Sequence, residues 1–163
     1  MGNQSFEIRC LQSGEQALLK SLRLTALQYD PQSYWEKTTE AESYEDTYWS
    51  DLALQLTRPD GSRMFILEQD GVVRGFVYGI SKGAGEHRIG GLWVEPACRG
   101  RKYGYALVQR VVSWARTQPG MTSIRLWSPT GSMVCFYEKN GFKPLGRIQT
   151  HPSDGRQIVE VDR

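Results

Sequence analysis

The segment from Leu92 to Leu107, LWVEPACRGRKYGYAL, joins a β-strand pattern to an α-helix pattern. The strand pattern ends at Val94, and apolar residues at helical spacing predict a helix from Lys102 to Arg116. The loop between them contains a proline, a glycine and basic residues. Because the first turn of a helix has unpaired backbone N–H groups and the positive end of the helix dipole, this position favours an anion.

Charge and backbone flexibility strengthen that expectation. Arg99, Arg101 and Lys102 place three positive charges in the loop, and glycine lets the backbone approach a phosphate closely. An ordinary strand-to-helix turn with a solvated basic rim would have the same local features, so both interpretations stay open. The loop is not a P-loop, and no glycine trio opens a dinucleotide-binding unit.

Period-two alternation and turn signals predict strands in the rest of the chain. Asp70-Gly71 is a strong hairpin signal, whereas residues 83–85 suggest a loose loop. Gly90-Gly91 predicts a bulge or a plain kink inside a strand. The expected strands cover residues 6–11, 64–68, 72–80, 86–94, 123–127, 142–146 and 157–161.

Period-3.6 patterns predict helices between these strands. The first helix is expected to begin at Ser13, with Gln16 in capping-box register, and a second to develop toward residues 49–56. The last should begin at Ser128-Pro129 and stop at Asn140-Gly141. Together the elements predict a single α/β domain over residues 1–163, with a mixed, mostly antiparallel sheet of about six to seven strands and about four flanking helices.

Composition excludes several classes of protein. The chain has 163 residues, 39% hydrophobic and 23% charged, which suits one globular domain. No apolar run approaches the ~18 residues of a membrane span. The net charge of +2 does not indicate bulk nucleic-acid binding. The basic loop by itself gives only weak support for binding a nucleic acid. With scattered cysteines, no metal-ligand spacing and no secretion signal, we expect a cytoplasmic protein with no metal, membrane or nucleic-acid partner.

Two motifs resemble those of the GNAT superfamily of N-acetyltransferases. Residues 94–107, V-x-P-x-x-R-G-x-x-x-G-x-A-L, are similar to that family's acetyl-CoA pyrophosphate loop, Arg/Gln-x-x-Gly-x-Gly/Ala, with Lys102 in place of the middle glycine. Residues 136–142, FYEKNGF, are similar to its late helix motif, Tyr-Glu-Lys-x-Gly-Phe. The order of strands and helices extends the resemblance from Phe6 to Val161. A GNAT-like fold is therefore expected.

The resemblance implies an acetyl-CoA-dependent N-acyltransferase. It would transfer the acetyl group to a primary amine of a small molecule, protein or peptide by direct attack in a ternary complex. The basic loop would hold the pyrophosphate of the coenzyme, and the pantetheine arm would pair with the end of the central strand. The implied cofactor-binding residues are Trp93, Val94, Arg99, Gly100, Arg101, Lys102, Tyr103, Gly104, Tyr105, Thr130, Met133 and Phe136.

The resemblance also implies catalytic residues. Tyr137 stands at the family's position for the acid that protonates the leaving thiolate, although its ring could simply pack in the core. Glu86 is the implied base, with His87 beside it, or either could be a solvated loop residue. Another family position for a catalytic glutamate is occupied here by Arg125.

The acceptor site is the least specified part of the resemblance. Trp35 and Glu36 would bind the substrate, and the acidic residues that follow would suit a cationic amine, although a charge run is usually a solvated face. A non-catalytic acyl-CoA-binding sensor is the alternative to an enzyme. A homodimer is possible, because dimers are common in this family.

Overall fold

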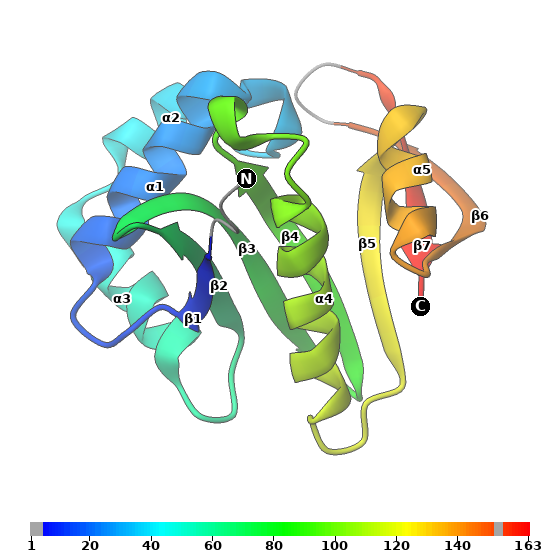
Figure 1. Cartoon of the computed structure of the whole chain (residues 1–163), viewed down its shortest axis with the longest axis horizontal. Helices are drawn as coiled ribbons and strands as arrows, with labels where there is room; N and C mark the ends of the chain where they lie inside the picture. The colour runs from blue at the N-terminus through cyan, green and yellow to red at the C-terminus, as the bar shows by residue number, and fades with distance from the viewer. Residues whose placement is uncertain (1–4, 152–154) are drawn as a thin grey trace. The chain divides into compact units, whose positions relative to one another are not determined.

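The computed structural model describes residues 5–151 and 155–163 (Figure 1). Its seven strands form one mixed sheet in the order β1-β2-β3-β4-β5-β7-β6. This confirms the predicted α/β fold, and its five helices compare with about four expected. The elements are β1 (Glu7–Cys10), α1 (Gln16–Tyr29), η1 (Pro31–Ser33), α2 (Thr38–Ser43), α3 (Asp46–Thr57), β2 (Arg63–Gln69), β3 (Val72–Gly83), β4 (Glu86–Val94), η2 (Pro96–Cys98), α4 (Tyr103–Arg116), β5 (Ser123–Pro129), α5 (Ser132–Lys139), β6 (Lys143–Thr150) and β7 (Gln157–Asp162).

The chain divides into two compact units, each built from two separate segments. The first contains the described residues up to Gln12 together with Leu56–Ile124, and so holds β1 to β4 and α4. The second contains Ser13–Gln55 and Arg125–Arg163, and so holds α1, α2, α5, β6, β7 and most of α3 and β5.

Tight hairpins connect β2 to β3 and β3 to β4. Asp70 (φ 53°) and Gly71 (φ 74°) are both left-handed, as a two-residue hairpin requires, which confirms the first turn. The loose loop expected at residues 83–85 is wrong, because β3 extends to Gly83 and Ala84 (φ 49°) and Gly85 (φ 80°) form a second turn of the same kind. Strand pairing therefore continues to the turn.

Helix α4 packs across β2, β3 and β4, as Figure 1 shows. Two glycines on β3 allow the close approach. A Cβ atom on Gly79 would lie 2.6 Å from the ring of Trp114, and one on Gly75 would lie 3.2 Å from Leu107 Cδ1 and 2.7 Å from the Trp93 carbonyl oxygen. These glycines are needed for packing, since the space of a side chain is already filled.

The two predicted helix starts in the second unit are wrong. Helix α1 begins at Gln16 rather than Ser13, because Gly14 (φ 91°) has a backbone conformation that a helix cannot continue. Ser128-Pro129 belongs to β5 and pairs with β7, so the next helix begins only at Ser132. Pairing between distant strands thus overrides a local capping signal.

Two further predictions on helices have mixed outcomes. The expected helix near residues 49–56 is present as α3, but the short helix α2 precedes it. The stop at Asn140-Gly141 is confirmed, since Asn140 caps α5 and Gly141 has φ 90°.

Some chemical features can be read directly from the described ranges. Within residues 5–151 and 155–163, no helix is long and apolar enough to cross a lipid bilayer. In the same ranges, no three His, Cys, Asp or Glu side chains gather as metal ligands. Cys10, Cys98 and Cys135 are free thiols, of which Cys98 is buried and Cys135 exposed.

Candidate functional site

Strand β4 is irregular at the predicted glycine pair. The register with β3 shifts between the pairs Phe76–Trp93 and Tyr78–Gly90, so two residues of β4 face one of β3. Gly91, inside the shift, has φ 57°. The bulge predicted by the two glycines is confirmed, and it bends β4 just before the loop.

The loop after β4 is held against the strand that precedes it. Arg99 Nε donates a hydrogen bond to the Val94 carbonyl oxygen at 2.9 Å. Lys102 caps α4 in the left-handed region (φ 64°, ψ 11°). This residue replaces the family's middle glycine, yet its backbone adopts a conformation typical of glycine. A residue with a Cβ adopts this conformation at a cost of roughly 1–2 kcal/mol.

The start of α4 concentrates hydrogen-bond donors and positive charge. The first hydrogen bond within the helix runs from the Ala106 N–H to the Lys102 carbonyl oxygen (3.0 Å), which leaves the N–H groups of residues 103–105 without a helical partner. Among the described residues, no side chain caps this helix and no acidic residue lies in its first turn. Arg99, Arg101 and Lys102 are all exposed. The geometry suits a diphosphate.

The two tyrosines of this turn differ in their surroundings. Tyr103 is buried, its hydroxyl donates a hydrogen bond to Gln69 Oε1 at 2.8 Å, and its ring lies 5.1 Å from that of Phe6. Tyr105 is 46% exposed. Tyr103 can therefore offer a ligand only its backbone N–H, whereas Tyr105 can also offer its side chain.

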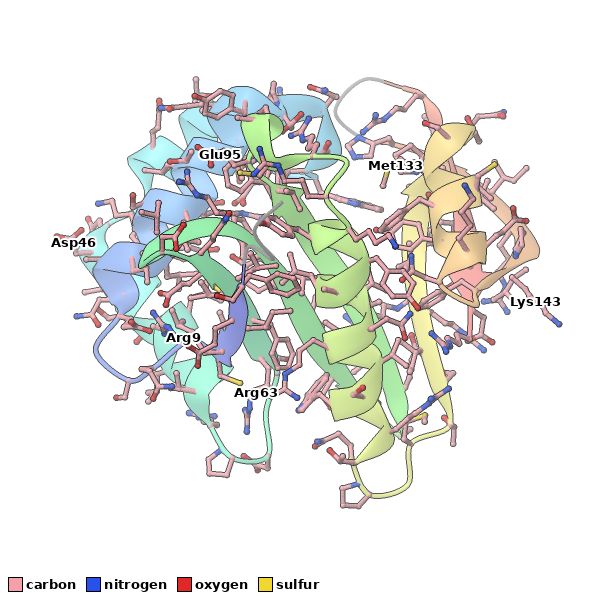
Figure 2. The ribbon with its side chains drawn as sticks, in the orientation of Figure 1. Arg9, Asp46, Arg63, Glu95, Met133 and Lys143 are labelled. Carbon is pink, nitrogen blue, oxygen red and sulfur yellow. The ribbon has the colours of Figure 1, made fainter. Side chains whose placement is uncertain are left out.

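Glu95 lies between β4 and the basic loop and is labelled in Figure 2. Arg74 Nη1 donates a hydrogen bond to Glu95 Oε2 at 2.6 Å, and Cys98 Sγ donates to the same oxygen at 3.4 Å. Arg74 holds the pKa of Glu95 below its usual range. Burial, and then Glu95, raise the pKa of the Cys98 thiol. No signal in the sequence predicted this ion pair, because Arg74 lies on β3 and Glu95 follows β4, 21 positions later.

The structure places Glu86 at the opposite end of β4 from the loop. From Glu86 to Val94 the strand rises by roughly 25 Å, and Arg88 Nε donates to Glu86 Oε1 at 2.6 Å. His87 is buried, with its ring 5.3 Å from that of Trp114. The structure therefore does not bring Glu86 to the coenzyme loop, and a solvated loop position for His87 is wrong.

Helix α5 and the turn before it hold the remaining residues implied by the resemblance. Tyr137 is buried, with ring centroids 5.0 Å from Phe136 and 5.9 Å from Phe142. Burial raises the pKa of Tyr137 above its usual value, so the tyrosine stays protonated at neutral pH. Of the other residues, Thr130 and Met133 are exposed, and Phe136 is half-buried.

Trp35 and Glu36 follow one another between η1 and α2. The indole of Trp35 is 52% exposed and lies 5.5 Å from the ring of His151. Glu36 is half-buried and accepts a hydrogen bond from Arg23 Nε at 2.5 Å. Glu36 therefore belongs to an ion pair, while the tryptophan ring is accessible.

Tyr44 and Tyr48 extend this polar and aromatic set, with ring centroids 4.1 Å apart. Burial, and then the carboxylates of Glu36 and Glu40, raise the pKa of Tyr44 to about 12. Burial and Glu36 also raise the pKa of Tyr48. Burial disfavours any charge here, but the carboxylates that add to these shifts would favour a nearby cation. The acidic run after Glu36 was expected from the sequence, whereas these two tyrosines were not.

The comparisons with known proteins identify the family. The model described as the Acetyltransferase (GNAT) family matches residues 24–142, well over half of the chain. The chain therefore belongs to the GNAT acetyltransferase family, whose members are acyltransferases that use acetyl-CoA. No curated protein matches the sequence.

Solved structures with the same fold extend over nearly the whole chain. A GNAT-family acetyltransferase from Streptococcus pneumoniae is 13% identical, with 98% of each chain covered and a TM-score of 0.80. Spermidine N-acetyltransferase from Vibrio cholerae, in complex with CoA and spermine, is 17% identical over 99% of this chain and 96% of that one (TM-score 0.73). Ard1 from Thermoplasma volcanium is 24% identical over 97% and 96% (TM-score 0.70). These likenesses confirm the expected GNAT fold.

Proposed function

We propose that this protein transfers an acetyl group from acetyl-CoA to a primary amine of a small molecule, protein or peptide, by direct attack in a ternary complex. The observation that carries the proposal is the start of α4, where backbone N–H donors and three exposed cations coincide. Charge-assisted donors in this arrangement suit the diphosphate of a coenzyme. Family membership supports the reaction class.

The coenzyme would be bound largely through the backbone. The N–H groups of residues 103–105 and the side chains of Arg99, Arg101 and Lys102 would contact its diphosphate, and Gly100 would let the loop backbone approach it. Trp93 and Val94 have buried side chains, so the pantetheine arm would meet their backbone. Further contacts are proposed at Thr130, Met133 and Phe136.

Bound acetyl-CoA supplies a thioester, whose acetyl group an uncharged amine can attack. Tyr137 would hold its phenolic proton for the departing sulfur, and its raised pKa keeps that proton in place at neutral pH. Glu86 is the proposed base that accepts the proton given up by the attacking amine, and it is paired with Arg88 at the start of β4. An α-amine, with a pKa of about 7.7–8.0, would lose its proton at a cost of only about 1 kcal/mol at pH 7.

Trp35 and Glu36, with Tyr44 and Tyr48, would line the acceptor site. Their aromatic faces and the nearby carboxylates suit a cationic amine. The Vibrio cholerae spermidine N-acetyltransferase, solved with CoA and spermine, has the same fold, so polyamines belong among the amines tested.

A thiol-release screen tests this proposal. Acetyl-CoA is supplied with polyamines, aminoglycosides, amino acids or peptides, while calorimetry measures the binding of coenzyme A. We expect coenzyme binding and amine-dependent release of thiol. Binding with only slow hydrolysis and no acceptor would instead support the sensor. Absence of coenzyme binding would overturn both functions.

A further inference from the structure

The first residue of α4 is tied to the sheet by a buried polar contact. The hydroxyl of Tyr103 donates a hydrogen bond to Gln69 Oε1 at 2.8 Å, and the two residues are only 4% and 5% exposed. The ring of Phe6 packs on Tyr103 at 5.1 Å. Because water is largely excluded, this hydrogen bond is strong, and breaking it would leave a buried amide oxygen unsatisfied.

Gln69 is itself held firmly. It is the last residue of β2 and pairs with Val72 across the Asp70-Gly71 turn. The loop before α4, in contrast, is exposed from Arg99 to Lys102 and contains Gly100 at φ 78°. Tyr103 is therefore the point at which an exposed loop meets a side chain anchored in the sheet.

We propose that Gln69 is a positioning residue for the coenzyme loop. It holds Tyr103, and through that residue it fixes the direction of the N–H groups of residues 103–105 toward a diphosphate. This inference rests on the proposed function. Preorganised donors bind an anion more tightly because they need no reorientation when it arrives.

The test compares two probes in calorimetry, coenzyme A and pantetheine, which lacks the diphosphate and the nucleotide. Tyr103→Phe and Gln69→Met each remove one partner of the hydrogen bond. We expect each variant to bind coenzyme A about threefold to tenfold more weakly, with unchanged affinity for pantetheine. The double variant should lose no more affinity for coenzyme A than the weaker-binding of the two single variants, because both changes remove the same hydrogen bond.

Ile66→Val is the matched control, since Ile66 is buried in β2 and its shortening destabilises the same unit while both partners of the hydrogen bond are kept. Urea unfolding confirms that each variant is folded before binding is measured, and Gln69→Met tests the contact if Tyr103→Phe does not fold. Normal coenzyme binding by the folded variants, an equal loss for pantetheine, or an equal loss in Ile66→Val would overturn the inference. If the unmodified protein does not bind coenzyme A, the proposed function itself has failed.

Discussion

Lys102 carries a Cβ in a backbone conformation that favours glycine. It adopts φ 64° at the cap of α4, where the family motif has glycine. A residue with a Cβ is disfavoured there, so the neighbouring structure must impose the conformation. In exchange, the loop gains a positive charge beside the N–H groups of the first helical turn.

Two substitutions separate strain from charge at Lys102. Lys102→Gly and Lys102→Ala both remove the charge, but only glycine relieves the left-handed conformation. We expect the free energy of unfolding, measured with urea, to be about 1 kcal/mol higher for Lys102→Gly than for Lys102→Ala. Both variants should bind coenzyme A several-fold more weakly, chiefly at low ionic strength. Equal stability of the two would show that the strain is absent.

Tyr137 is expected to affect turnover more than binding. Tyr137→Phe keeps the packing against Phe136 and Phe142 but removes the proton donor, so kcat should fall by about 10²–10⁴-fold while the Kd of coenzyme A changes little. Because burial raises the pKa of Tyr137, the tyrosine should stay protonated up to about pH 10. Its deprotonation should therefore cause no loss of kcat in that pH range. Unchanged turnover would assign the ring to core packing alone.

Helix α4 depends on small residues in the strand beneath it. Gly79→Ala places a Cβ 2.6 Å from the ring of Trp114, which is 9% exposed and has little room to move. We expect a loss of about 1–3 kcal/mol in the free energy of unfolding. Gly90→Ala is the comparison, since its Cβ would meet only the flexible end of Ile80 at 3.0 Å. If urea unfolding shows that Gly79→Ala and Gly90→Ala lose equal free energy of unfolding, the close contact between Gly79 and Trp114 is contradicted.

The junction of β4 and its loop should respond to acid through Glu95. Arg74 lowers the pKa of Glu95 in the folded chain, so the carboxylate stabilises the fold at pH values above its unfolded pKa, near 4.5. That contribution is lost as pH falls through the lowered folded pKa. The difference in free energy of unfolding between the unmodified protein and Glu95→Gln should therefore shrink below about pH 4.5. A constant difference from neutral to acid pH would show that the pair does not form.

For the chain as a whole, coenzyme binding should appear as increased stability. A ligand bound only by the folded state at about 100 times its Kd adds about 2.7 kcal/mol. Coenzyme A should therefore raise the Tm in a thermal scan, and Arg99→Ala with Arg101→Ala should reduce the shift. Inorganic pyrophosphate is the control for unspecific binding of anions. An equal shift in the double variant would place coenzyme binding away from the loop.

Most of the order of helices and strands was predictable, because hydrophobic periodicity is local. The Asp70-Gly71 turn, the bulge at Gly90-Gly91 and the stop at Asn140-Gly141 follow from the conformational preferences of a few adjacent residues. The prediction failed at Ser128-Pro129, where pairing with β7 outweighed a local capping signal. Pairing with a strand so distant along the chain cannot be predicted from the residues next to Ser128 and Pro129.

The amino-acid sequence alone determined the basic loop, its place between a strand and a helix, and the resemblance to an acetyltransferase family. Only the tertiary structure decided what supports that loop. Tyr103 meets Gln69 across 34 positions of sequence, and Arg74 meets Glu95 across 21. The reason is physical, since backbone preference acts over a few neighbouring residues, whereas buried hydrogen bonds and ion pairs form only when distant segments pack together.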